Sequence, residues 1–161
     1  MSKIAVYPGT FDPVTFGHLD VIKRIAAIYE KVYVAVAVSK VKEPLFGVEE
    51  RVELLTKAVK DLKNVTVEHF SGLMVDYAVS KNSKVVVRGL RMISDFEYEF
   101  QMALTNRKLN PNIETIFMMP NESYSYLSSR LIKEAVRLGA DVSAFVPLDV
   151  KMKLQERLSN E

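Results

Sequence analysis

Apolar residues follow two alternating patterns along the chain. The first pattern consists of short runs rich in β-branched residues, three of them nearly continuous, as expected for strands buried on both faces of a sheet. These runs cover residues 3–7, 32–38, 65–70, 84–89 and 113–119. We therefore predict five β-strands.

The second pattern is a recurrence of apolar residues at helical spacing between the runs. It comprises Leu19, Ile22, Ile25, Ala26 and Tyr29, then Val52, Leu55, Val59 and Leu62, then Phe96, Phe100, Ala103 and Leu104. Strands that alternate with helices predict an α/β fold, a doubly wound five-stranded parallel sheet with helices on both faces. We expect a single domain over residues 1–161, with a C-terminal helix at about 147–159.

In such folds ligands bind at the carboxyl ends of the strands, near the point where the strand order reverses. The segments that follow the predicted strands are therefore the candidates for a site. They are residues 8–18, 39–46, 71–74, 88–95 and 120–130.

The first of these segments belongs to the stretch YPGTFDPVTFGH, residues 7–18. Asp12 precedes a proline and so favours a turn, and Thr15 is a plausible N-cap for the helix that buries Leu19 and Ile22. The uncovered N–H groups of that first helical turn would attract an anion, and His18 would point into the same site. A capped helix with a partly buried histidine is the ordinary alternative.

The next two segments offer one charged and one apolar candidate. Lys42 could serve as a flexible point charge for a phosphate, whereas the neighbouring Lys40 could simply be solvated. Met74 could fill the core, or it could form the wall of a site for an uncharged substrate arm.

Two arginines follow the fourth predicted strand. Arg88 and Arg91 flank Gly89, and the fixed guanidinium fork suits phosphate oxygens. A surface ion pair is the ordinary alternative for a single arginine. Ser94 and Glu97 match a capping box, which predicts that the next helix opens there.

A serine pair precedes the last candidate helix. Ser128 or Ser129 can cap this helix, whose free N–H groups would form a second anion cradle, although capping alone would explain both serines. Arg130 and Lys133 oppose the usual acidic preference of a first turn, which suits a bound polyanion. The residues expected to be buried on this helix are Leu131, Ile132 and Val136.

Composition narrows the function classes. The 161-residue chain has no cysteine, which excludes disulfides and thiolate chemistry and favours a cytoplasmic location. Its formal net charge of +2 is far below the positive charge typical of nucleic-acid-binding proteins. We therefore expect the ligand to be a phosphorylated metabolite rather than a nucleic-acid polymer. No apolar run is long enough to cross a bilayer, so we expect no membrane partner.

These motifs carry a resemblance to a known family. The stretch TFGH, residues 15–18, has the T/H-x-G-H form of the nucleotidyltransferase superfamily. Nearly the whole chain resembles the bacterial phosphopantetheine adenylyltransferases, which implies a Rossmann-like nucleotidyltransferase fold. The residues that carry the resemblance are YPGTFDPVTFGH, the Lys42 loop, EERVELL at 49–55, RGLR followed by DFEYE within 88–99, and SYLSSRLIKE at 125–134.

The resemblance implies adenylyl transfer from ATP to 4′-phosphopantetheine, giving dephospho-coenzyme A and pyrophosphate, with Mg²⁺ accompanying ATP. It also implies a homohexamer and feedback binding of coenzyme A. The residues implied to hold phosphopantetheine are Thr10, Lys42, Met74 and Arg88. Those implied to contact ATP are Thr10, Phe11, His18, Gly89, Leu90, Arg91, Glu99, Tyr124, Ser125, Tyr126, Leu127, Ser128, Ser129 and Arg130.

For catalysis we expect His18 to stabilise the α-phosphate, Thr10 to orient the attacking phosphate, and Lys42 and Arg88 to offset anion repulsion. One departure from the resemblance is Arg130, where the family often has serine or threonine. Another is Lys133, where the wider superfamily has arginine.

Two alternatives remain open at this point. Another transferase of the superfamily, such as a cytidylyltransferase or a nicotinamide-mononucleotide adenylyltransferase, would share the TFGH site. Lys42, Met74 and RGLR favour an extended phosphorylated arm instead. A non-catalytic nucleotide sensor is the second alternative, and the combination of Thr10 with His18 favours an enzyme over it.

Overall fold

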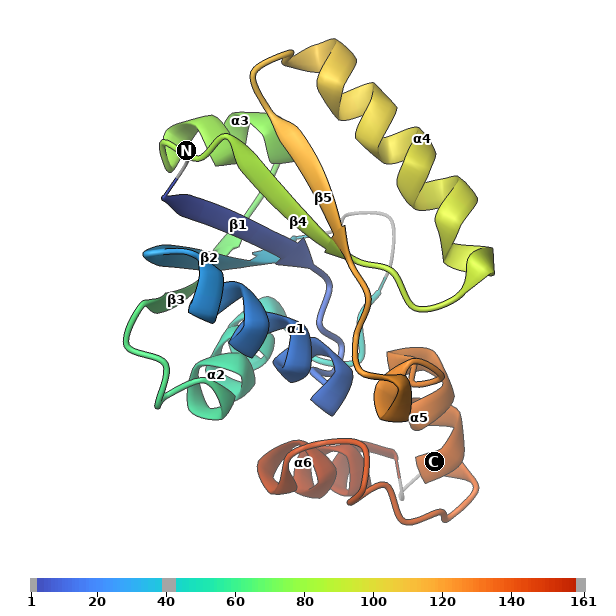
Figure 1. Cartoon of the computed structure of the whole chain (residues 1–161). Helices are drawn as coiled ribbons and strands as arrows, with labels where there is room; N and C mark the ends of the chain where they lie inside the picture. The colour runs from blue at the N-terminus through green and yellow to red at the C-terminus, as the bar shows by residue number, and fades with distance from the viewer. Residues whose placement is uncertain (1–2, 39–42, 159–161) are drawn as a thin grey trace.

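The computed structural model describes residues 3–38 and 43–158 and contains one five-stranded parallel sheet (Figure 1). The strands are β1 (Ile4–Gly9), β2 (Lys31–Ala37), β3 (Val65–Phe70), β4 (Val85–Gly89) and β5 (Glu114–Met118). Their order in the sheet is β3-β2-β1-β4-β5. The α/β prediction with five parallel strands is therefore confirmed.

Helices cover both faces of the sheet, as Figure 1 shows. The helices are α1 (Phe16–Ile28), α2 (Val48–Ala58), α3 (Met74–Ser80), α4 (Ile93–Leu109), α5 (Ser129–Arg137) and α6 (Leu148–Leu158), with a short 3₁₀ turn η1 (Glu122–Tyr124). One core cluster joins the sheet to α1, α2, α5 and α6, and a second joins its other face to α3. No helix in the described part of the chain is both long and apolar enough to span a membrane.

The strand order reverses between β1 and β4. The chain moves outward from β1 to β2 and β3, then returns to place β4 on the other side of β1. The loops that follow β1 and β4 therefore meet at one edge of the sheet, where a crevice is expected. Gly9 and Gly89 are the last residues of these two strands.

Two sequence expectations about helix α4 differ from the structure. Phe96 and Phe100 are each 46% exposed in this chain, and the most buried side chains of α4 are Glu99 and Asn106. The predicted Ser94 capping box is wrong, because α4 begins at Ile93 and its N-cap is Met92, which makes no side-chain capping bond.

The serine-capped helix α5 matches its prediction except at one residue. Ser128 is its N-cap, and Ile132 and Val136 are buried. Leu131 is 51% exposed, so its predicted burial is wrong. Ile132 and Val136 are four residues apart and share the buried face, whereas Leu131 lies about 100° around the helix from Ile132.

Candidate active site

Two adjoining cavities open at the carboxyl edge of the sheet. The first has a volume of about 450 Å³ and is lined by the loops after β1 and β4 and by the start of α5. The second has a volume of about 340 Å³ and lies between α3, α4 and the sheet. The residues that line both are Pro8, Gly9, Thr10, Arg88 and Glu99.

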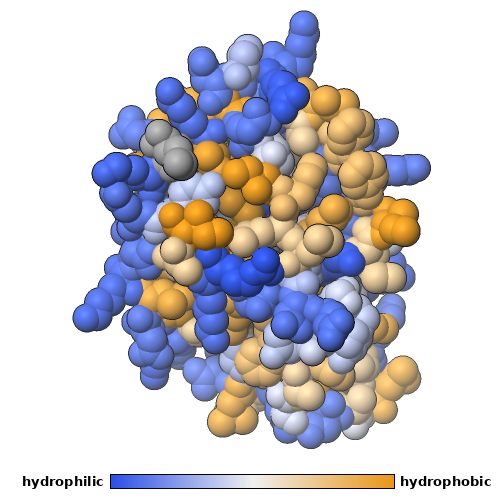
Figure 2. Space-filling view, viewed as in Figure 1, coloured by the Kyte–Doolittle hydropathy of each residue, from blue (hydrophilic) through white to orange (hydrophobic). Residues whose placement is uncertain are grey.

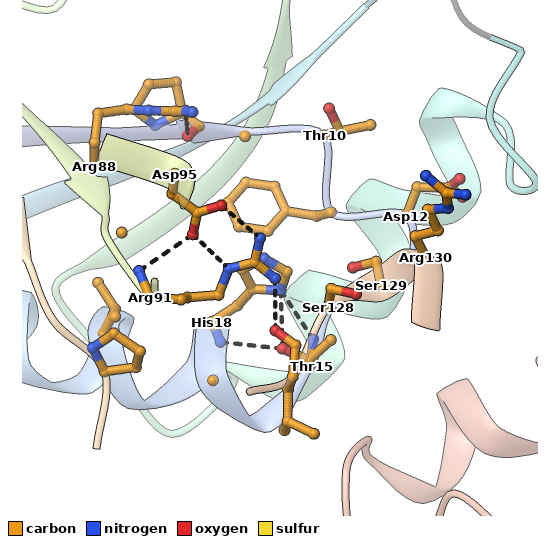
Figure 3. A pocket seen from close by; sticks show the side chains of 18 of the residues that line it. Thr10, Asp12, Thr15, His18, Arg88, Arg91, Asp95, Ser128, Ser129 and Arg130 are labelled. Carbon is orange, nitrogen blue, oxygen red and sulfur yellow. Dashed lines mark hydrogen bonds and ion pairs between the residues drawn. The ribbon is translucent and has the colours of Figure 1, made fainter. Parts of the chain in front are cut away.

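The helix α1 begins with Thr15 as its N-cap, as predicted. Thr15 Oγ1 accepts a hydrogen bond from the His18 backbone N–H at 3.3 Å, and the Thr15 backbone N–H donates to His18 Nδ1 at 3.0 Å. Because Nδ1 is an acceptor in this pairing, the proton of the neutral ring belongs on Nε2. The cap therefore selects the tautomer that can donate from Nε2. Figure 3 shows these contacts inside the first cavity.

The environment of His18 keeps its ring neutral. Burial lowers the pKa of His18 from 6.5 to about 4, and the positive charges of Arg91 and Arg88 add to this effect. Near pH 7 the ring is thus a neutral hydrogen-bond donor rather than a cation.

Two aromatic side chains, Phe11 and Tyr7, help to hold the His18 ring in position. The Phe11 ring lies edge-on to the His18 ring, with centroids 5.0 Å apart, and Tyr7 packs edge-on against Phe11 at 5.5 Å. Phe11 adopts a left-handed backbone conformation with φ of 50°. A Cβ atom at Gly9 would lie 2.9 Å from the Phe11 ring, so this tight turn after β1 requires glycine there.

The two predicted arginines are both held by carboxylates of α4. Arg88 donates from Nε and Nη2 to Glu99 at 2.9 and 2.6 Å, and from Nη1 to the Pro8 carbonyl at 2.7 Å. Arg91 donates to Asp95 and, from Nη1, to the Leu127 carbonyl at 2.6 Å. Both guanidinium groups are therefore fixed at the cavity by bonds to a helix and a loop.

Glu99 stabilises the charged guanidinium of Arg88. Burial alone disfavours the charged guanidinium, but the hydrogen bonds and negative charge of Glu99 outweigh it, so the pKa of Arg88 is raised. The bidentate geometry leaves Arg88 one fixed orientation between the two cavities.

The first loop also contacts the start of α5. Asp12, which sequence reasoning assigned only to a turn, is buried and pairs with Lys133 at 2.8 Å between Oδ2 and Nζ. Ser129 Oγ donates to the Pro13 carbonyl at 2.7 Å. The side chain of Arg130 is largely exposed and pairs with Glu134 at 3.5 Å. The first two contacts bring the loop after β1 together with the start of α5, although these segments are more than a hundred positions apart in the chain.

The second cavity is largely apolar with a few polar side chains. Met74 lines this cavity together with Leu73 and Met102, which agrees with the prediction that Met74 forms part of an apolar wall. Asn106 and Thr115 add polar groups that sequence reasoning missed. Asn106 lies two helical turns after Glu99 and therefore on the same face of α4. Given Glu99 as a site residue, the helical spacing alone would have predicted Asn106.

The predicted site residues gather at this edge with some exceptions. Those that line a cavity are Thr10, Phe11, His18, Met74, Arg88, Gly89, Arg91, Glu99, Leu127, Ser128, Ser129 and Arg130. Leu90, Tyr124, Ser125 and Tyr126 line neither cavity. Lys42 lies outside the described residues. The described residues hold no group of three or more His, Cys, Asp or Glu side chains suited to a metal ion.

Comparison with known proteins places this site in a family. Residues 6–135 match the model of the cytidylyltransferase-like family. A solved structure from Vibrio parahaemolyticus, assigned as a nicotinate-nucleotide adenylyltransferase, superposes with a TM-score of 0.69 over 96% of this chain and 99% of its own. At 21% identity it supports the fold alone.

Curated relatives cover nearly the whole chain. The phosphopantetheine adenylyltransferase of Caldanaerobacter subterraneus subsp. tengcongensis is 53% identical over 96% of this chain and 97% of its own. That of Clostridium tetani is 51% identical over 99% of both chains. By these matches, the chain belongs to the phosphopantetheine adenylyltransferases, within the cytidylyltransferase-like family.

Proposed function

We propose that the protein transfers the adenylyl group of ATP to 4′-phosphopantetheine, giving dephospho-coenzyme A and pyrophosphate in coenzyme A biosynthesis. The observation that carries this proposal is the junction of two unlike cavities at Thr10 and Arg88. The first, with His18 and several basic side chains, suits a nucleoside triphosphate. The second, which is largely apolar, suits an uncharged arm whose phosphate reaches the junction.

The reaction requires one in-line displacement. An oxygen of the 4′-phosphate forms a bond to the α-phosphorus of ATP while the bond from that phosphorus to the pyrophosphate oxygen breaks. The attacking phosphate is already an anion near neutral pH, so the step needs neither a general base nor a covalent enzyme intermediate. Positioning and electrostatic stabilisation then supply the catalysis.

His18 is the proposed donor to the transition state. Its neutral ring offers the Nε2 proton to an oxygen of the α-phosphate as negative charge increases there. With a pKa of about 4 the ring is neutral near pH 7, so it is proposed to act by donating a hydrogen bond and not as a charged acid.

The attacking phosphate is oriented by Thr10 and Arg88 at the junction of the cavities. Arg88 and Lys42 reduce the repulsion between the two anionic substrates. Arg91 and the N-terminus of α5 hold the phosphates of ATP. ATP enters as its Mg²⁺ complex, the metal being held mainly by the nucleotide phosphates and water.

One assay tests the proposed function. Purified protein receives ATP with 4′-phosphopantetheine, nicotinamide mononucleotide or glycerol 3-phosphate, and pyrophosphate release is measured. We expect turnover with 4′-phosphopantetheine only. Turnover with either other acceptor would favour a different transferase of the superfamily, and ATP binding without any turnover would favour a nucleotide sensor.

The quaternary structure and regulation belong to the same proposal. The exposed apolar side chains of α4, including Ile93 at 91%, support burial against further copies in a homohexamer (Figure 2). Coenzyme A carries the same pantetheine arm as the product, so it would occupy the second cavity and act as a feedback inhibitor. The proposed location of the reaction is the cytoplasm.

A further inference from the structure

Arg51 of α2 is a buried arginine at the wall of the first cavity. Only 3% of its surface is exposed. Its Nε donates to the Phe46 carbonyl at 3.0 Å, and its Nη1 donates to the carbonyls of Thr10 at 2.8 Å and Ala37 at 3.1 Å. One guanidinium thus joins the loop after β1, the end of β2 and the segment that precedes α2.

The buried surroundings of Arg51 disfavour its positive charge, so a side chain that only filled space here would not need to be charged. Burial lowers the pKa of the Arg51 guanidinium, and the negative charges of Asp12 and Glu49 oppose that effect only in part. An apolar side chain of similar length would fill this space without the desolvation cost. The three hydrogen bonds to backbone carbonyls therefore indicate that this position uses the guanidinium group to hold three chain segments in fixed positions.

Thr10 depends on this contact because the sheet no longer holds it. The last residue of β1 that pairs with β2 is Gly9, and the residue after Thr10, Phe11, turns into the left-handed region. The bond from Arg51 fixes the Thr10 carbonyl at the point where the chain leaves the strand. It thereby fixes the distance between Thr10 and His18, whose ring packs on Phe11.

Asp12 also joins the loop after β1 to the segment before α2. Its carboxylate accepts hydrogen bonds from the backbone N–H groups of Leu45 at 2.9 Å and Phe46 at 3.0 Å. Phe46 is therefore held through its N–H by Asp12 and through its carbonyl by Arg51. This set of bonds holds the loop after β1 against the segment before α2 through groups of the protein itself.

We propose that Arg51 is a positioning residue for Thr10, acting through the Thr10 backbone to align the attacking phosphate with the α-phosphorus. This inference rests on the proposed function, in which Thr10 orients that phosphate. Arg51 itself touches neither reacting atom. Small displacements of a reacting group lower rates steeply, so we expect loss of the fork to lower kcat by about 10- to 100-fold.

A double-mutant cycle tests the proposal. Arg51→Lys keeps the positive charge but loses the forked donor geometry. Arg51→Met removes the charge as well, so it does not bury the unpaired ammonium group that the lysine variant would bury. Each is made in the wild-type and Thr10→Ala backgrounds, and kcat, both KM values and calorimetric ATP affinity are measured. Arg157→Lys is the matched control, because Arg157 also donates to a backbone carbonyl of this segment, Leu45 at 2.9 Å, from the exposed side.

The expected result is a fall in kcat for both Arg51 variants with little change in ATP affinity. In the Thr10→Ala background the same changes should lower kcat by no more than about twofold, because coupled residues are not additive. Arg157→Lys should keep wild-type kcat.

Three outcomes would overturn the inference: unchanged kcat in folded Arg51 variants, equal losses in both backgrounds, or loss of the folded state in both variants by circular dichroism. An inactive wild-type protein would instead overturn the proposed function.

Discussion

The two ring nitrogens of His18 have different tasks, and the sequence motif predicts only one of them. Nδ1 accepts from the Thr15 backbone, which leaves Nε2 as the donor. The stretch TFGH indicates a histidine in the first turn of a helix, and the structure adds the tautomer and the lowered pKa. The tautomer follows from the Thr15 cap, whereas the lowered pKa follows first from burial and then from Arg91 and Arg88, which lie seventy or more positions away and could not be weighed from local spacing.

Replacement of His18 by alanine should lower kcat by about a hundredfold or more, because one preorganised donor to the transition state is lost. ATP affinity should change far less, since the ring is proposed to act on charge that develops during transfer. Pyrophosphate release and calorimetric ATP binding measure the two effects. His69→Ala is the control, because His69 is exposed on β3 and lines neither cavity. Wild-type kcat in the His18 variant would contradict the assignment.

The low pKa of His18 also predicts a pH dependence of stability. The unfolded chain takes up a proton at His18 near pH 6.5, whereas the folded protein does so only near pH 4. As pH falls between these values the unfolded state binds more protons, so this group lowers the free energy of unfolding. Urea unfolding at pH 7 and pH 4.5 should therefore show a smaller loss for His18→Gln than for the wild type. An equal loss in both proteins would contradict the shifted pKa.

At the scale of elements, the N-cap of α1 contributes both stability and site geometry. Thr15→Ala removes the hydroxyl that accepts from the His18 N–H and should lower the free energy of unfolding by about 1 kcal/mol. Thr15→Ser keeps the hydroxyl and should retain most of the stability. Urea unfolding of the two variants checks the difference, and equal destabilisation would show that the methyl group matters rather than the cap.

Helix α4 shows why periodicity predicts an element better than its packing. Phe96, Phe100 and Leu104 recur at helical spacing, and the helix is present, but each of these side chains is nearly half exposed. The buried side of α4 is polar at Glu99 and Asn106 because it faces Arg88 and the second cavity. A hydrophobic pattern cannot distinguish a face that packs on its own sheet from one available to another copy.

The exposed stripe of α4 predicts how the proposed hexamer can be broken. The Phe96 and Phe100 rings stack with centroids 5.5 Å apart, forming an apolar surface that a glutamate would disrupt. Phe96→Glu should lower the mass measured by light scattering after size exclusion. Ile28→Glu is the control, because Ile28 is also exposed, at 66%, but lies at the end of α1. An unchanged mass for Phe96→Glu would remove α4 from the interface.

At the scale of the whole molecule, the strand order produces the site. The five strands and the loops after them follow from the sequence because buried parallel strands have a strong local pattern. The order β3-β2-β1-β4-β5 then places Gly9 and Gly89 at a common edge. The sequence did not predict the roles of three residues, because their partners and surroundings are set by this tertiary arrangement and not by neighbours in the chain. These residues are Asp12, Arg51 and Thr115.

Thr115 of β5 connects the interior of the fold with the proposed substrate arm. Its Oγ1 is buried and has no hydrogen-bond partner among the described residues, although Thr115 lines the second cavity. A buried hydroxyl without a partner lowers stability, so Thr115→Val, which keeps the shape, should raise the free energy of unfolding by about 1 kcal/mol. If the hydroxyl binds an amide of phosphopantetheine, the same change should raise the KM of that substrate severalfold and leave the KM of ATP unchanged.

Because Thr115→Val should stabilise the fold and at the same time weaken binding of phosphopantetheine, it is a sharp test of the second cavity. Thr56→Val is the matched control, because the Thr56 hydroxyl already donates to the Val52 carbonyl at 2.7 Å on the exposed side of α2. The control should lose stability slightly and keep both KM values, since it breaks a bond remote from either cavity. Urea unfolding and steady-state kinetics are measured on both variants. A more stable Thr115→Val protein with an unchanged KM for phosphopantetheine would show that the arm does not use this hydroxyl, and a rise in the KM of ATP would place the nucleotide in this cavity instead.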